Sequence, residues 1–153
     1  MDSKTRDTIE RCAAESHAGA ITFGDVVNAL RAHGVESYRV DYRLRATYYY
    51  LPAGDTYSLT LPNARTTAMG EAFDIAALQA AIRGAQRNEV KYPEFVERSM
   101  HAGCVGYVVW ITGGHVSYFG RRGETLVEPF PAAPTKKDTR ARASAVSERR
   151  LDD

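Results

Sequence analysis

An internal repeat constrains the fold of this chain more than any other feature of its sequence. Residues 22–62 align without a gap with residues 91–131, at an offset of 69 residues. Eight of the 41 aligned positions are identical, whereas average residue frequencies give roughly two or three by chance. The identical pairs are Val27/Val96, Gly34/Gly103, Tyr38/Tyr107, Val40/Val109, Tyr49/Tyr118, Gly54/Gly123, Thr56/Thr125 and Pro62/Pro131. We therefore predict two copies of one unit, the alternative being convergent patterning of two similar units.

Each copy has the pattern of two helices followed by three strands. Apolar spacing predicts helices near residues 2–17, 22–33, 75–86 and 92–102. Their ends carry the expected signals: Thr22 and Asp74 as N-caps, Pro93 in a first turn, and Gly34 and Gly103 just past the last turns. Alternating segments predict strands at 35–42, 46–51, 56–61, 104–112, 115–120 and 125–130.

These elements predict an α+β fold made of two pseudo-repeated ααβββ units. The units span about residues 5–62 and 74–131, within a single domain of residues 1–131. We expect one antiparallel sheet, or two abutting sheets, with four helices on one face. Residues 132–153 have no aromatic side chain and carry six basic against four acidic residues, which predicts a disordered charged tail.

The first hairpin of each unit decides which side chains share a face of the sheet. Gly113 and Gly114 suit a two-residue turn, and the repeat places Leu44 and Arg45 at the same positions. Neither Leu nor Arg favours positive φ, so a wider or shifted first hairpin is the alternative. Opposed residues point to the same side, so one face collects Tyr38, Val40, Tyr42, Thr47, Tyr49, Leu51, Tyr107, Val109, Ile111, Val116, Tyr118 and Gly120. The identical pairs Tyr38/Tyr107, Val40/Val109 and Tyr49/Tyr118 lie on this face, which we expect to pack against the helices.

The opposite face differs between the two copies and is the candidate binding surface. Its proposed binding residues are Arg39, Asp41, Arg43, Tyr48, Tyr50, Trp110, His115 and Phe119. Trp110, Val108 and Phe119 would make an apolar patch of a kind that usually contacts a partner, a second subunit or the tail. The alternative is a solvated sheet surface in which cross-strand pairs contribute only a few tenths of a kcal/mol each.

Charge and cysteine content limit the partners and the compartment. The net charge is +1, so no overall field favours a polyanion. Tyr48, Tyr50, Arg39 and Arg43 have the chemistry to stack on single-stranded bases, but residues 1–131 carry one more acidic than basic side chain, which disfavours nucleic acid. The chain has two cysteines, no signal peptide pattern and no apolar run of membrane-spanning length. We expect a soluble cytoplasmic protein without membrane partners.

No motif in the sequence names a reaction. His101 and Cys104 form half of a zinc pattern, but with His115 they do not supply four ligands, so we expect no metal. Cys104 follows the end of a helix and is predicted to be a buried thiol. We expect no cofactor and no catalytic residue. The alternative is a small enzyme whose polar groups meet between the two halves, around Asp41, His101, Cys104 and His115.

Four stretches resemble a known family: FGDVVNALRAHGVESYRVD, TYYYLPAG, AIRGAQ and FVERSMHAGCVGYVVWITGGHVSYFGRRGE. Together they resemble the YbcV-like family of small bacterial proteins, a domain of unknown function sometimes labelled phage envelope protein because members occur in prophage regions. The resemblance spans most of residues 5–131. It implies an α+β fold and no established activity, cofactor or site residue. The resulting expectation is a non-enzymatic interaction module, with a protein partner or a homo-oligomer favoured.

Overall fold

The computed structural model describes residues 1–61 and 68–131. Along the chain the elements are α1 (Ser3–His17), α2 (Phe23–Ala32), β1 (Ser37–Asp41), β2 (Ala46–Tyr50), β3 (Thr56–Thr60), α3 (Ile75–Gln86), α4 (Tyr92–His101), β4 (Cys104–Trp110), β5 (His115–Gly120) and β6 (Thr125–Pro129). The α+β class is therefore confirmed. The predicted tail at 132–153 and Pro62 of the repeat lie outside the described residues.

The helices begin and end where their sequence signals predict. The side chains of Thr22 and Asp74 accept hydrogen bonds from backbone N–H groups three residues on, which satisfies donors that the first helical turn leaves free. Gly34 and Gly103 follow the C-caps of α2 and α4 with φ of 80° and 87°. This left-handed conformation suits glycine, which has no Cβ. Lys91 is the N-cap residue of α4, but unlike Thr22 its side chain makes no hydrogen bond to the first turn of its helix.

All six strands form one antiparallel sheet in the order β3-β2-β1-β4-β5-β6. The two meanders join through β1 and β4, where Arg39 pairs with Val108, its own counterpart at the offset of 69. Tyr38 pairs with Val109, the counterpart of Val40, and Val40 pairs with Tyr107, the counterpart of Tyr38. The helices α2 and α4 also begin and end 69 residues apart. The halves thus correspond around an approximate two-fold axis, while the duplication itself stays a prediction.

The first hairpins are wider than the two-residue turns predicted. Asp41 pairs with Ala46, and Trp110 pairs with His115, so each loop has four residues. Arg45 and Gly114, at equivalent positions, both adopt positive φ. In the first loop the backbone N–H groups of Arg43 and Leu44 donate to the Asp41 carboxylate, an arrangement that needs no glycine pair. Each observed loop is two residues longer than predicted. Because side chains alternate between faces with a period of two, the predicted assignment of side chains to faces is unchanged.

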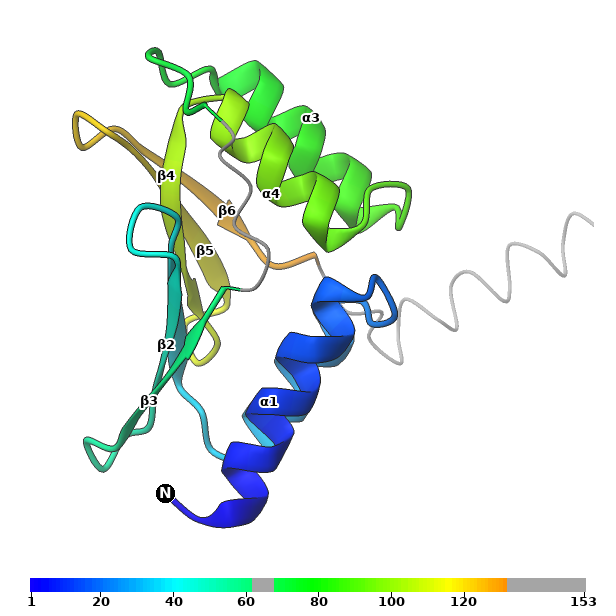
Figure 1. Cartoon of the computed structure of the whole chain (residues 1–153), viewed down its shortest axis with the longest axis vertical. Helices are drawn as coiled ribbons and strands as arrows, with labels where there is room; N and C mark the ends of the chain where they lie inside the picture. The colour runs from blue at the N-terminus through cyan, green and yellow to red at the C-terminus, as the bar shows by residue number, and fades with distance from the viewer. Residues whose placement is uncertain (62–67, 132–153) are drawn as a thin grey trace, which may run out of the picture.

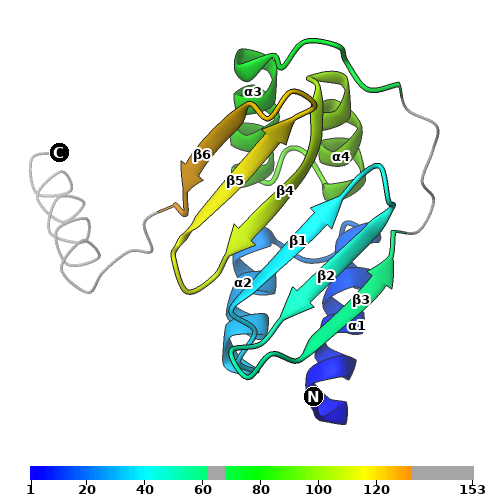
Figure 2. The same cartoon turned by 90° about the vertical axis from the view of Figure 1, so that its left-hand side faces the viewer.

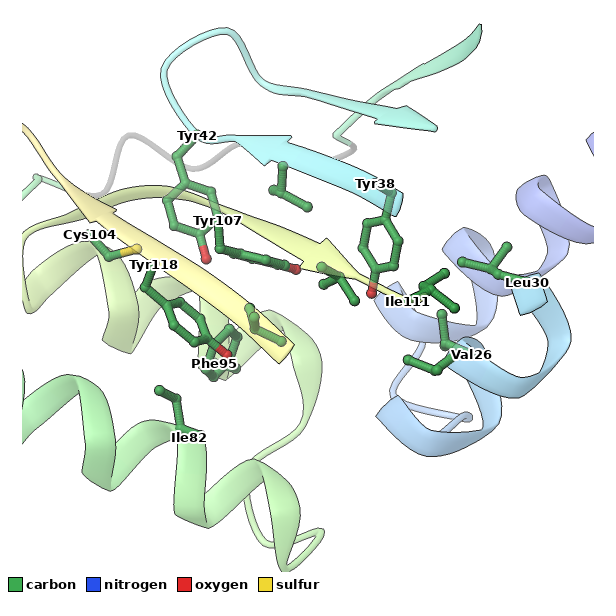
Figure 3. Close-up of a cluster of buried hydrophobic side chains, with 14 of the residues drawn as sticks. Val26, Leu30, Tyr38, Tyr42, Ile82, Phe95, Cys104, Tyr107, Ile111 and Tyr118 are labelled. Carbon is green, nitrogen blue, oxygen red and sulfur yellow. The ribbon is translucent and has the colours of Figure 1, made fainter. Parts of the chain in front are cut away.

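The molecule has two layers, with all four helices on one side of the sheet (Figure 1). Figure 2 shows the opposite side of the sheet, which none of the four helices of residues 1–61 and 68–131 covers. The helix-covered side contains the main core, and the side chains predicted to pack there are buried, including Tyr38, Val40, Tyr49, Val109 and Tyr118. Figure 3 shows Tyr38, Tyr107 and Tyr118 reaching from the strands towards the helices. Within the described residues, no helix is long and apolar enough to cross a membrane.

Candidate functional site

The sheet side without helices, called the outer face below, carries the candidate binding residues in three cross-strand rows. Strand register sets each row. The first row contains Thr56, Tyr50, Ser37, Trp110, His115 and Pro129; the second contains Ser58, Tyr48, Arg39, Val108, Ser117 and Val127; the third contains Thr60, Ala46, Asp41, Gly106, Phe119 and Thr125. All predicted binding residues within the strands therefore lie on one surface, with Arg43 in the adjoining loop.

Trp110 is the most exposed aromatic side chain of the first row, with 40% of its surface accessible. Its indole Nε1 donates to the Ser117 hydroxyl at 3.1 Å, and the His115 ring lies 6.3 Å away. These contacts hold the indole over the sheet. Ser37 lies between Tyr50 and Trp110 and is only 6% exposed, because two large side chains flank a small one.

The charged residues of the outer face form one connected group. Arg39 donates to the Asp41 carboxylate at 2.9 Å, and its guanidinium lies 5.9 Å from the centre of the Tyr48 ring. Asp41 is 8% exposed. Its burial opposes ionisation, but hydrogen bonds from the backbone of Leu44, from Arg39 and from Arg43 outweigh it and lower its pKa. Asp41 thus fixes the hairpin and Arg39, and its oxygens already have partners.

Val127 also belongs to this surface, although the sequence analysis did not include it. It is 55% exposed and pairs with Ser117 in the second row. The alternation in the segment TLVEPF predicts its direction, because Leu126 and Glu128 point towards the helices and Val127 points away. The apolar patch therefore extends from Trp110 across β5 to β6.

The four residues of the enzymatic alternative are not brought together. Asp41 pairs with Gly106 at one end of the β1–β4 ladder, whereas His115 pairs with Trp110 beyond the other end. His101 is exposed in the last turn of α4. Cys104 is fully buried and its Sγ–H donates to the Gly106 carbonyl at 3.2 Å. Burial raises the pKa of this thiol to about 11, which keeps it protonated and unreactive.

The described residues contain no metal-binding cluster. Across residues 1–61 and 68–131, no group of three or more His, Cys, Asp or Glu side chains is arranged to hold an ion. Cys12 is buried as well, at the inner side of α1. Both thiols therefore belong to the packed interior.

Sequence comparisons give relatives without an assigned activity. Uncharacterised proteins of Mycobacterium tuberculosis and Mycobacterium bovis are 36% identical to the chain over 70 residues. The match covers 42% of this chain and 43% of each relative, so it spans less than half the length of these curated relatives. No family model matches the chain. The comparisons therefore leave the outer face, with its exposed aromatic residues, as the basis for a functional proposal.

Proposed function

We propose that the protein is a non-enzymatic interaction module that self-associates through its outer face. The observation that carries the proposal is the exposed Trp110 indole, held over a sheet surface that none of the described helices α1 to α4 covers. Antiparallel sheets commonly leave one side to water, but then that side is polar. An exposed indole that shares its surface with Val127 and with the partly exposed Tyr50 and Phe119 is instead typical of an interaction surface.

A second copy of the chain is the partner that best complements this surface. The first half presents Arg39, Arg43 and Tyr48, whereas the second half presents Trp110 and Phe119. A face-to-face dimer whose two-fold axis runs parallel to the strands places the first half of one copy on the second half of the other. Guanidinium groups then lie on aromatic rings, an attractive arrangement when water is excluded.

The dimensions of the face indicate a weak dimer. Six strands of about five residues give a flat footprint of about 24 by 17 Å, or roughly 400 Å². Stable interfaces bury about 800 Å² per partner, and smaller ones belong to transient complexes. We therefore expect a monomer–dimer equilibrium with a Kd on the order of micromolar.

Sedimentation velocity over a range of concentrations tests this proposal. Trp110→Ala is expected to weaken the dimer by about tenfold or more, and Tyr48→Ala by less, because aromatic anchors at interface centres dominate binding. The melting temperature of either monomer is expected to change little. The matched control is Ile75→Ala, which truncates a side chain that is 46% exposed at the start of α3, on the helix side.

Two results would count against self-association. A monomer at all concentrations excludes it and leaves a different protein as the partner of the outer face. A large loss of stability in Trp110→Ala with unchanged association means that the indole serves packing alone. The same proposal includes a cytoplasmic location, which the low cysteine content supports, and a prophage setting, which the resemblance to the YbcV-like family supports.

A further inference from the structure

A cavity of about 140 Å³ lies on the other side of the sheet, between the sheet and the two helix pairs. Equivalent positions of the two halves form its walls, among them Tyr38 with Tyr107 and Tyr49 with Tyr118. Phe23 meets Phe130 edge-on at 5.6 Å, and His17 meets Tyr92 edge-on at 5.2 Å. Both ring contacts join the first half to the second, so the cavity straddles the approximate two-fold axis.

Three tyrosine hydroxyls reach this cavity without a protein partner. Tyr38, Tyr49 and Tyr118 line it and are 7%, 5% and 7% exposed. No hydrogen bond links their hydroxyls to any residue within 1–61 or 68–131. Every fully enclosed side-chain oxygen in the described part does have a partner, so these three oxygens open onto the cavity. Figure 3 shows the hydroxyl ends of Tyr38 and Tyr118 pointing away from the sheet.

The neighbouring buried tyrosines have partners of their own. The Tyr42 hydroxyl lies 2.8 Å from that of Ser99, and the Tyr92 and Tyr107 hydroxyls lie 2.9 Å apart. The repeat explains the difference at Tyr38. The counterpart of Tyr92 in the first half is Phe23, which has no hydroxyl to offer. Buried hydroxyls normally have hydrogen-bond partners, so unpaired ones that face a cavity point to a bound molecule.

Size and surroundings define the class of that molecule. A cavity of about 150 Å³ in an engineered lysozyme holds one benzene ring, which is close to the volume here. The walls are aromatic and aliphatic, with Phe95 6.3 Å from the Tyr118 ring and Tyr38 stacked on Tyr49 at 5.5 Å. A further ring adds favourable edge and offset contacts to such a set.

We propose that the cavity binds a small neutral phenol-like molecule, with its ring among these aromatic side chains and its hydroxyl bonded to Tyr38, Tyr49 or Tyr118. Phenols match the tyrosine hydroxyls as both donors and acceptors. An anion is disfavoured because most of the walls are apolar and the charged groups already have partners: Glu128 is paired with Arg83 at 3.0 Å, and Lys91 donates to Asn88 at 2.8 Å. The site is separate from the outer face, and the inference stands independently of self-association.

Calorimetric titration of the full chain with phenol tests the proposal, with benzene and benzoate as comparison ligands. Phenol is expected to bind saturably with a Kd of about 0.1–1 mM, given its few atoms. Benzene is expected to bind several-fold more weakly and benzoate not detectably. Replacement of a single hydroxyl by Tyr38→Phe, Tyr49→Phe or Tyr118→Phe should weaken phenol binding by about 2- to 10-fold at the position that is used.

Two further variants locate the ligand. Tyr42→Phe removes the hydroxyl of a buried tyrosine that does not line the cavity, and it should leave the phenol affinity unchanged. Ala85→Leu enlarges a side chain of the cavity wall and should abolish binding. Circular dichroism confirms that each variant is folded before titration.

Four outcomes would overturn the inference. The first is no saturable phenol binding up to the solubility limit, and the second is benzene binding as tightly as phenol. The third is unchanged phenol affinity in all three cavity Tyr→Phe variants, which excludes the hydroxyls. The fourth is wild-type affinity in Ala85→Leu, which places the ligand elsewhere on the protein.

Discussion

The buried tyrosines make the stability of this protein sensitive to alkaline pH. The chain has nine tyrosines, and burial raises the pKa of six of them, that of Tyr92 to about 12. The six are Tyr38, Tyr42, Tyr49, Tyr92, Tyr107 and Tyr118. Since the unfolded chain releases these protons above about pH 10 and the folded chain keeps them, the free energy of unfolding falls as the pH rises.

The size of this loss is comparable to the whole stability of a domain. At one pH unit above the unfolded pKa, each retained proton lowers the free energy of unfolding by about 1.4 kcal/mol. Six groups give about 8 kcal/mol at about pH 11, whereas domains of this kind are stable by about 5–15 kcal/mol. We therefore expect cooperative unfolding between about pH 10 and pH 12.

A stopped-flow jump to about pH 11, followed by the ultraviolet absorbance of tyrosinate, distinguishes tyrosines that ionise at once from tyrosines that ionise only when the protein unfolds. At most three of the nine tyrosines should ionise in the fast phase, and at least six should ionise at the rate at which far-ultraviolet circular dichroism is lost. Tyr49→Phe should reduce only the slow phase, by about one sixth. Ionisation of more than three tyrosines before the circular dichroism changes would contradict the burial of these six hydroxyls.

Two further predictions use equivalent positions of the repeat. Gly34→Ala and Gly103→Ala both place alanine at positive φ, but a Cβ at Gly103 would lie 2.1 Å from the Ala72 carbonyl oxygen, while Gly34 faces open space. In urea denaturation we expect losses of about 1–2 kcal/mol for Gly34→Ala and about 3 kcal/mol or more for Gly103→Ala; equal losses would contradict the clash. Lys91→Thr supplies the cap that Thr22 provides to α2 and should stabilise α4 by about 0.5–1 kcal/mol. Thr22→Ala is its counterpart and should lose a similar amount, and a destabilised Lys91→Thr would show that the capping geometry differs.

Local pattern predicted the elements and the two faces of the sheet because both depend on neighbours in the chain. The caps Thr22 and Asp74 and the glycines after α2 and α4 act within a single helical turn. The inner direction of Tyr49 follows from the alternation of a strand. The two-residue turn at Leu44 and Arg45 was wrong, and the wider alternative is observed. The Asp41 carboxylate caps this loop, and side-chain capping at a loop is not visible in apolar periodicity.

The cavity was not predicted, because it depends on how the two halves meet. The pairing of β1 with β4 joins residues about 69 apart, and sequence patterns left open whether one sheet or two would form. The one available signal was the identity of Tyr38 with Tyr107 and of Tyr49 with Tyr118. We interpreted these pairs as packing residues, and only the structure shows that some of their hydroxyls lack partners.

The approximate two-fold axis connects the two proposed sites. It passes between Arg39 and Val108, which pair with each other at the centre of the sheet. On the helix side of this point the counterparts Tyr38 and Tyr107 are identical, so both halves contribute the same ring to one cavity. On the outer side the counterparts are a charged and an aliphatic residue, so that surface has no symmetry within one chain. A partner that complements the whole surface must place an apolar half on the cationic half and a cationic half on the apolar half. A second copy of the chain does so when the two-fold axis runs parallel to the strands.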